Sequence, residues 1–171
     1  MLRLCLTAAL VAAVPLAAAP ATAAEIVKHA NTPPGLILQG VTVPAGAEMF
    51  YLSGMLASPV DASKPMGPTT TMADLGDTRT QTISVFTKMK AALASHGYTM
   101  ADVIKLTVFV AGDPRLGGKM DFAGMNEGFK TFFGTAENPG TVARSTVQVA
   151  ALAGPPFLVE IEATAAKMPQ R

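Results

Sequence analysis

Cysteine is nearly absent from this sequence of 171 residues, since Cys5 is the only one. It lies in an N-terminal segment, residues 1–24, that we expect to be removed, so the mature chain would contain no thiol. This excludes disulfide bonds and a cysteine nucleophile. Charge is also scarce, at 15% of residues. No Lys or Arg cluster supplies the electrostatic footprint of nucleic-acid binding, and we predict no nucleic-acid partner.

Motifs of several large enzyme classes are missing as well. The sequence contains neither a G-x-S-x-G nucleophile elbow nor a P-loop. Its two histidines, His29 and His96, are far apart and have no partners at metal-ligand spacing, so we expect no metal site. We find no long internal repeat. The length is typical of a single domain with a real core.

Residues 1–24 have the pattern of a secretory signal peptide. Arg3 gives a basic start, an apolar stretch runs from Leu4 to Leu16, and Ala21-Thr22-Ala23 fits a cleavage site. A membrane anchor is the alternative, but the short apolar run and its prolines disfavour a stable span. We therefore expect a signal peptide (1–24), a mature domain (25–171), a periplasmic or secreted location and no membrane attachment. Removing Arg3 from the 13 basic residues balances them against 12 acidic ones.

Hydrophobic periodicity in the mature chain predicts the element order ββαβαββ. Strands are expected at residues 36–43, 48–56, 103–110, 143–151 and 157–165, and helices at 79–96 and 119–133. The Pro/Thr/Gly-rich segment 57–78 is long for a loop, which indicates a mobile or functional segment. Two helices on one face of a mostly antiparallel sheet would make an α+β domain.

The last two predicted strands carry the most informative polar residues. Arg144 begins one strand, and Glu160 and Glu162 alternate along the other. A hairpin centred near residues 153–154 would place Arg144 and Glu160 on the same sheet face. Pattern alone allows two interpretations. One is ion pairing across a solvated face, and the other is an arginine fork for a substrate carboxylate beside an acid–base glutamate.

Several motifs, taken in order, resemble the RidA (YjgF) family of enamine/imine deaminases. They are LQG at 38–40, LSGM at 52–55, QT at 81–82, DVIKLTVFV at 102–110, MNEGFKTFF at 125–133, ARSTVQV at 143–149 and VEIEATA at 159–165. The resemblance spans essentially the whole mature chain. It implies a chorismate-mutase-like α+β fold and a homotrimer. In that homotrimer the helix-free sheet faces point toward the threefold axis and the active sites lie between subunits.

The resemblance also implies an activity and the residues that carry it. Relatives hydrolyse reactive enamines and imines such as 2-aminoacrylate to a 2-keto acid and ammonia, as 2-iminobutanoate/2-iminopropanoate deaminases, without metal or cofactor. By position, Arg144 matches the arginine that holds the substrate carboxylate. Glu160 matches the residue that orients or activates water. Ser53, Gly54 and Asn126 match residues that line the substrate cleft.

Two predicted substrate-binding positions depart from the family pattern. Ile37 stands where a tyrosine is usual, so a hydroxyl is missing from the cleft, and Thr146 stands where cysteine is common. The first departure leaves a second function open, a non-catalytic periplasmic trimer whose Arg144 binds a small carboxylate. A third function, a chaperone-like or RNA-cleaving role, is ascribed to relatives, and neutral charge and export make RNA the least expected target.

Overall fold

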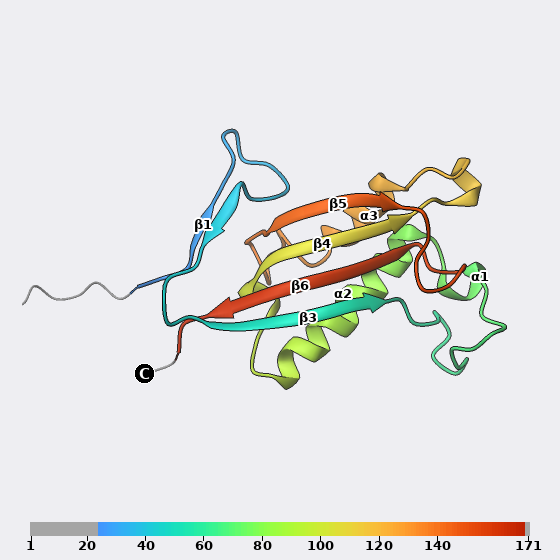
Figure 1. The fold of residues 1–171 in the computed structure, drawn as a ribbon, viewed down its shortest axis with the longest axis horizontal. Helices are drawn as coiled ribbons and strands as arrows, with labels where there is room; N and C mark the ends of the chain where they lie inside the picture. Colours follow the sequence, from blue (N-terminus) through green and yellow to red (C-terminus); the bar gives the residue numbers. More distant parts are fainter. Residues whose placement is uncertain (1–23, 170–171) are drawn as a thin grey trace, which may run out of the picture.

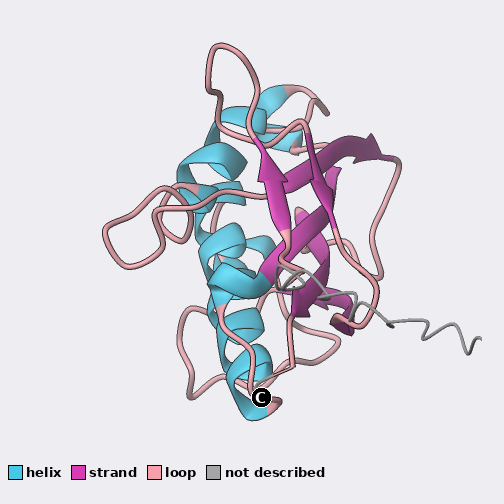
Figure 2. Ribbon diagram, turned by 90° about the vertical axis from the view of Figure 1, so that its left-hand side faces the viewer, coloured by secondary structure: helices cyan, strands magenta, loops and turns pink. Residues whose placement is uncertain are grey.

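The computed structural model describes residues 24–169 and consists of two layers, a sheet and a layer of helices (Figures 1 and 2). Almost all of the predicted signal segment lies outside the described residues. None of the helices between residues 24 and 169 is long and apolar enough to cross a membrane. The four strands of the main sheet are, in spatial order, β3 (Glu48–Leu56), β6 (Val159–Lys167), β4 (Val103–Ala111) and β5 (Ala143–Val149).

The strand order confirms the α+β class but corrects the predicted closing hairpin. Strands β3 and β6 pair antiparallel, as do β6 and β4, whereas β5 pairs only with β4 and runs parallel to it. Strand β4 therefore lies between β5 and β6, and the Gly-Pro-Pro connection passes its end (Figure 1). Sequential strands usually pair. Here the most apolar strand, VIKLTVFVA, takes a central place, where both of its edges are paired.

The two predicted helices cover one face of the sheet, as expected. Helix α2 (Thr78–Ser95) begins at Asp77, whose side chain accepts a hydrogen bond from the Thr80 amide at 2.8 Å. It ends before Gly97, where a positive φ of 76° suits glycine. Helix α3 (Phe122–Phe129) is shorter than the predicted 119–133 because Asp121 caps it and turns follow it.

The core lies between the sheet and these helices. Its fully buried side chains come from every layer: Val103, Leu106, Val108 and Val110 of β4, Ile161 of β6, Val85, Phe86, Met89 and Leu93 of α2, and Met125 and Phe129 of α3. Phe122 is 45% exposed, because it is the first residue of the shortened helix. Gly128 lets α3 approach α2, since a Cβ there would collide with Thr82.

The N-terminal part forms a second, smaller sheet. Strands β1 (Val27–His29) and β2 (Gly40–Thr42) pair antiparallel, so the predicted strand 36–43 is too long and β1 was not predicted. Residues 36–38 are not part of a strand because Leu36 and Leu38 bond to the segment before β5, whereas the Gln39 N–H donates to the His29 carbonyl of β1 at 2.9 Å. Leu38 donates its N–H to the Val142 carbonyl at 2.9 Å, beside the start of β5.

The long segment 57–78 is partly ordered by its own short helix, α1 (Met72–Leu75), which periodicity missed. Leu75 is fully buried, and the Ser58 amide donates to Ser84 Oγ on α2 at 2.9 Å. Two 3-10 helices, η1 (Met100–Asp102) and η2 (Pro114–Leu116), flank β4. The segment is thus attached to the helical layer at both ends.

Candidate functional site

Arg144 lies near the start of β5 and extends over α3. Its Nη2 donates a hydrogen bond to Asn126 Oδ1 at 2.7 Å, and its Nη1 lies 3.7 Å from the sulfur of Met125. The guanidinium carbon stands 4.5 Å from the centre of the Phe129 ring. Residues 125, 126 and 129 lie within about one turn of the helix, so a single element positions the guanidinium from three sides.

The charge of Arg144 is not neutralised within the described chain. No carboxylate of residues 24–169 lies within 4.0 Å of its nitrogens. The side chain is partly buried, and this burial lowers the pKa of the Arg144 guanidinium because water solvates the charged form less well. A half-buried cation with unused N–H donors in a planar fork attracts a carboxylate, which can accept two parallel hydrogen bonds.

Thr146 lies two residues further along β5, on the same sheet face as Arg144. Its partner across the sheet, Val108, is fully buried under the helices. The hydroxyl of Thr146 is buried and makes no hydrogen bond within the described residues. An unpaired buried hydroxyl costs about 1–3 kcal/mol. The structure thus places two predicted substrate-binding residues, Arg144 and Thr146, side by side.

Glu160 lies on β6 and points to the other face of the sheet. Its neighbours Val159 and Ile161 are fully buried under the helices, and side chains alternate along a strand. The carboxylate of Glu160 rests against Gly54, because a Cβ at that position would collide with Glu160 Oε1. Gly54 and the exposed Ser53 lie where the pairing of β3 with β6 is irregular. They therefore belong to the group of residues around Glu160 and not to the group around Arg144.

The prediction that Arg144 and Glu160 share a sheet face is therefore wrong. Arg144 pairs with Leu106 of β4, which is buried under the helices, whereas Glu160 pairs with Phe109 three residues along the same strand. The register of β5 is set by its parallel pairing with β4 and not by the turn at 153–154. Glu162 lies on the open face with Glu160, as the alternation predicted.

The remaining predicted residues fall near the first of these two groups. Asn126 contacts Arg144 directly. Ile37 is half-buried in the segment that runs beside the start of β5, where the Thr141 hydroxyl donates to the Leu36 carbonyl at 2.6 Å. Sequence reasoning did not identify Phe129 as a support of the guanidinium. In the sequence Phe129 is one apolar residue of the predicted helix at 119–133, and nothing marks it as a contact of Arg144.

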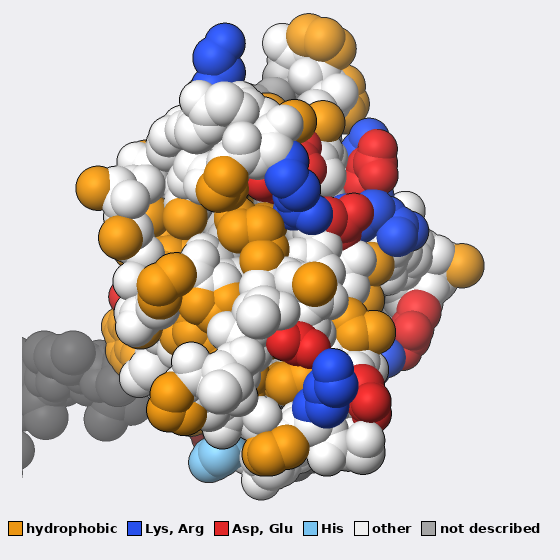
Figure 3. Space-filling view, turned by 90° about the vertical axis from the view of Figure 1, so that its right-hand side faces the viewer, with side chains coloured by type: hydrophobic (Ala, Val, Ile, Leu, Met, Phe, Trp, Pro, Cys, Tyr) orange, Lys and Arg blue, Asp and Glu red, His pale blue; other side chains and the backbone are white. Residues whose placement is uncertain are grey.

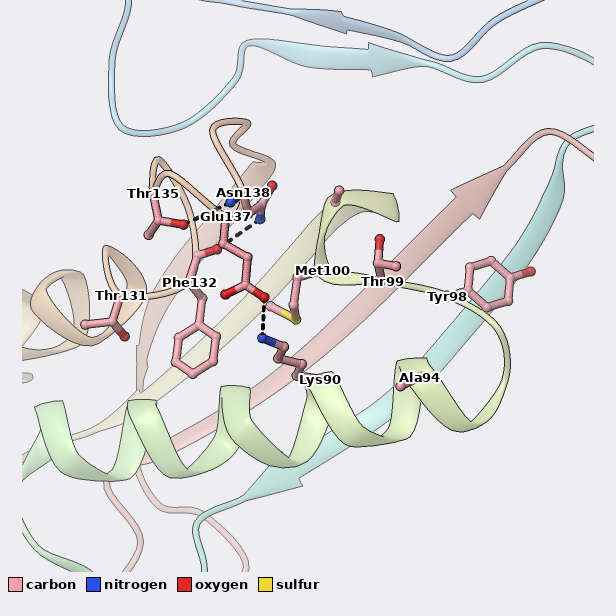
Figure 4. Close-up of a pocket in the computed structure, with 11 residues that line it drawn as sticks. Lys90, Ala94, Tyr98, Thr99, Met100, Thr131, Phe132, Thr135, Glu137 and Asn138 are labelled. Atoms are coloured by element: carbon pink, nitrogen blue, oxygen red, sulfur yellow. Dashed lines mark hydrogen bonds and ion pairs between the residues drawn. The ribbon is translucent and has the colours of Figure 1, made fainter.

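Two hollows of the surface lie away from both groups. One, of about 420 Å³, lies at the end of the sheet where β4 and β5 finish, and is lined mainly by Ala111, Pro114, Phe157 and residues 150–155. Figure 3 shows this end of the molecule, with apolar side chains gathered in the middle and charged ones mostly toward one side. The other hollow lies beside α2 (Figure 4).

Among residues 24–169 no three His, Asp or Glu side chains gather as metal ligands would.

Known proteins share this architecture. Residues 39–167 match the family model described as Endoribonuclease L-PSP. A RutC family protein of Pyrococcus horikoshii is 33% identical over 143 residues, which are 84% of this chain and 98% of that protein. The crystal structure of the Rid protein YyfB from Yersinia pestis has a TM-score of 0.58 at 25% identity, covering 77% of this chain and 87% of that one. Escherichia coli TdcF with bound serine has a TM-score of 0.52 at 31% identity, covering 82% and 93%.

The fold and these matches define the class of the protein. It is an α+β domain with a mixed, mostly antiparallel sheet covered by helices on one face. The chain belongs to the Endoribonuclease L-PSP family, which includes the RidA, YjgF and RutC proteins. The resemblance seen in the short sequence motifs is thus confirmed at the level of the family.

Proposed function

We propose that this protein is a hydrolytic deaminase of small enamines and imines that carry a carboxylate. The observation that carries the proposal is the environment of Arg144. A half-buried guanidinium is held by Asn126 and Phe129, and no described carboxylate lies within ion-pair distance of it. Such a group fits a small anionic substrate of the 2-aminoacrylate or 2-iminopropanoate type, which offers a planar carboxylate to the arginine fork.

The chemistry needs a group that handles the proton of water. A water molecule adds its oxygen to the C=N carbon and loses one proton to the carboxylate of Glu160. Glu160 returns this proton to the nitrogen, which gives a neutral carbinolamine. The hydroxyl proton of the carbinolamine then passes through Glu160 to the nitrogen, the C–N bond breaks as the C=O bond forms, and ammonia leaves. The products are a 2-keto acid and ammonia. A positioned carboxylate of this kind contributes about 10²–10⁴-fold to such a step.

Arg144 and Glu160 reach one substrate only if two copies of the chain meet. Within a single chain they lie on opposite faces of the sheet. The open face also exposes Tyr51 at 73% and Val147 at 45%, and apolar side chains of this kind favour contact with a neighbour. We therefore include in the proposal a homotrimer in which Arg144 of one subunit and Glu160 of the next complete each site.

Mixing two inactive variants tests this proposal. Arg144→Ala and Glu160→Gln should each lose turnover of imino acids generated in situ. In a random trimer of both variants, roughly a quarter of the shared sites regain both groups, so activity should return to about that fraction of the wild-type value. Arg144→Ala mixed with the double variant is the matched control and should stay inactive. If mixed trimers form, verified by native mass spectrometry, and no activity returns, the shared site is refuted.

A second candidate function is carboxylate binding without turnover. Ile37 favours it, because the position offers no hydroxyl to the site. If the wild-type protein turns over none of the imines tested but binds pyruvate, and Arg144→Ala abolishes that binding, this function replaces the deaminase. If Ile37→Tyr raises turnover of small imino acids, the missing hydroxyl limits a working enzyme.

We also propose that the protein acts in the periplasm or after secretion, on the basis of the signal-like residues 1–24. The intact mass of the protein recovered from the periplasm or medium should lack the residues before Ala24 or Glu25. A mass that still includes Met1 would refute cleavage.

A further inference from the structure

A pocket beside α2, here called the α2 pocket, stands apart from the residues assigned to deamination. It has a volume of about 380 Å³ and lies between the second half of α2, η1 and the turns that follow α3. Its apolar wall is formed by Ala94, Met100 and Phe132. Pockets of about 300–1,000 Å³ with apolar walls and a few placed polar groups are typical of small-molecule sites.

Three polar side chains in the wall of the α2 pocket, those of Thr99, Thr131 and Asn138, already donate hydrogen bonds within the protein. Thr131 and Asn138 donate to main-chain carbonyls at 2.7 and 2.9 Å. The hydroxyl of Thr99 donates to Asp102 at 2.8 Å. An apolar ligand group can therefore lie against this wall without leaving these donors buried and unpaired.

Two opposite charges stand together at the edge of the pocket. Lys90 rises from α2 toward Glu137, and the ammonium nitrogen lies 2.7 Å from Glu137 Oε1 (Figure 4). Both side chains are at least half exposed, so a ligand can reach them. The ammonium has three N–H donors and the carboxylate has a second oxygen. Each group can therefore bind a further partner of opposite charge without breaking the pair.

We propose that the α2 pocket binds an α-amino acid with an apolar side chain, of the size of leucine or phenylalanine. The side chain would lie against Ala94, Met100 and Phe132. The carboxylate of the amino acid would accept a hydrogen bond from Lys90, and its ammonium group would donate one to Glu137. A zwitterionic amino acid fits this edge because its ammonium and carboxylate groups are both attached to the α-carbon. The two groups can therefore face Glu137 and Lys90, which lie side by side. The proposal is independent of the deaminase function.

Calorimetric titration of the mature protein with L-phenylalanine tests the proposal. Saturable binding is expected, and Ala94→Phe should weaken it at least about tenfold by filling the pocket. Ala91→Phe is the matched control, because Ala91 is exposed on the same helix but does not line the pocket. It should bind as the wild type does. No binding by the wild type, or equal binding by both variants, overturns the proposal.

Analogues with one charge test the role of the ion pair. 3-Phenylpropionate and 2-phenylethylamine should each bind about tenfold more weakly than phenylalanine, since each loses one charge-assisted hydrogen bond. Glu137→Gln should weaken phenylalanine but leave 3-phenylpropionate unchanged. Arg144→Ala should leave phenylalanine binding unchanged. If Arg144→Ala abolishes binding while Ala94→Phe does not, the amino acid occupies the Arg144 site and the α2 pocket is not its site.

Discussion

The two faces of the main sheet differ in how firmly they position a charged group, the guanidinium of Arg144 on the covered face and the carboxylate of Glu160 on the open face. On the covered face Arg144 lies against Phe129 and hydrogen bonds to Asn126, so helix α3 fixes its geometry. On the open face the carboxylate of Glu160 lies against Gly54, and within residues 24–169 it has no ion-pair partner. The guanidinium is positioned by side chains of α3, whereas the carboxylate makes no such contact within the described residues.

The two faces therefore present complementary groups, a guanidinium on the covered face and a carboxylate on the open face. On the covered face, the guanidinium of Arg144 has no carboxylate within 4.0 Å among residues 24–169. On the open face, the carboxylate of Glu160 has no cation within that distance in the same part of the chain. Substitutions on the two faces should therefore fail in different ways, with loss of catalysis on the open face and loss of substrate binding on the covered face.

The largest effect is expected at Glu160. Glu160→Gln keeps the shape but removes the proton acceptor, so kcat for imine hydrolysis should fall about 10²-fold or more. Glu162→Gln is the matched control, because Glu162 lies two residues along the same strand and face. It should change kcat little. Equal losses in the two variants would show that the open face acts through its overall charge.

Arg144 should show the next largest effect. Arg144→Lys keeps the charge but not the two-pronged geometry, so kcat/KM should fall about tenfold or more, on the order of 1.4 kcal/mol. Arg79→Lys alters an exposed arginine whose pairing with Glu127 spans 3.5 Å and should leave the kinetics unchanged. If Arg144→Lys keeps the full kcat/KM, the two-pronged hydrogen bonding of the substrate carboxylate by Arg144 is refuted.

Gly54 tests how the open face holds its carboxylate. A Cβ at this position collides with the Glu160 side chain, so Gly54→Ala should shift the carboxylate and lower kcat several-fold. Gly40→Ala is the control, since nothing lies within 4 Å of a Cβ there. Steady-state kinetics of both variants, with thermal melts to confirm folding, separate a site effect from a general one. An unchanged kcat in Gly54→Ala would mean that the position of the Glu160 carboxylate does not depend on its close contact with Gly54.

The smallest effect concerns the stability of the covered face. Asp77→Ala removes the cap of α2 and should lower the free energy of unfolding by about 1 kcal/mol at pH 7. The Thr80 hydrogen bonds lower the pKa of Asp77 below its usual 3.8. The charged cap therefore stabilises the fold above that value, and the benefit is lost as pH falls through the lowered pKa. Urea titrations should show the gap between Asp77→Ala and wild type narrowing in acid. A constant gap would contradict the role of the charge.

Much of the local structure could be predicted from the sequence. Strand β3 has the predicted bounds of residues 48–56, and α2 differs from the prediction by one residue at each end. Alternation put Glu160 and Glu162 on one face, as the structure shows. The family resemblance identified Asn126 as a site residue, although periodicity showed only that it lies in a helix. These features depend on neighbours within a few positions along the chain.

Only the tertiary structure decided which strands are neighbours and which face each group occupies. The sequence by itself determined that Arg144 and Glu160 lie on strands, but it did not show that β4 lies between those strands. Strand order depends on pairing between segments that are distant in sequence, and the gain from burying the apolar β4 at the centre outweighs the tendency of sequential strands to pair. The ion pair of Lys90 and Glu137, which are 47 positions apart, arises in the same way. Local patterns set the elements, and the packing of the whole core set their arrangement.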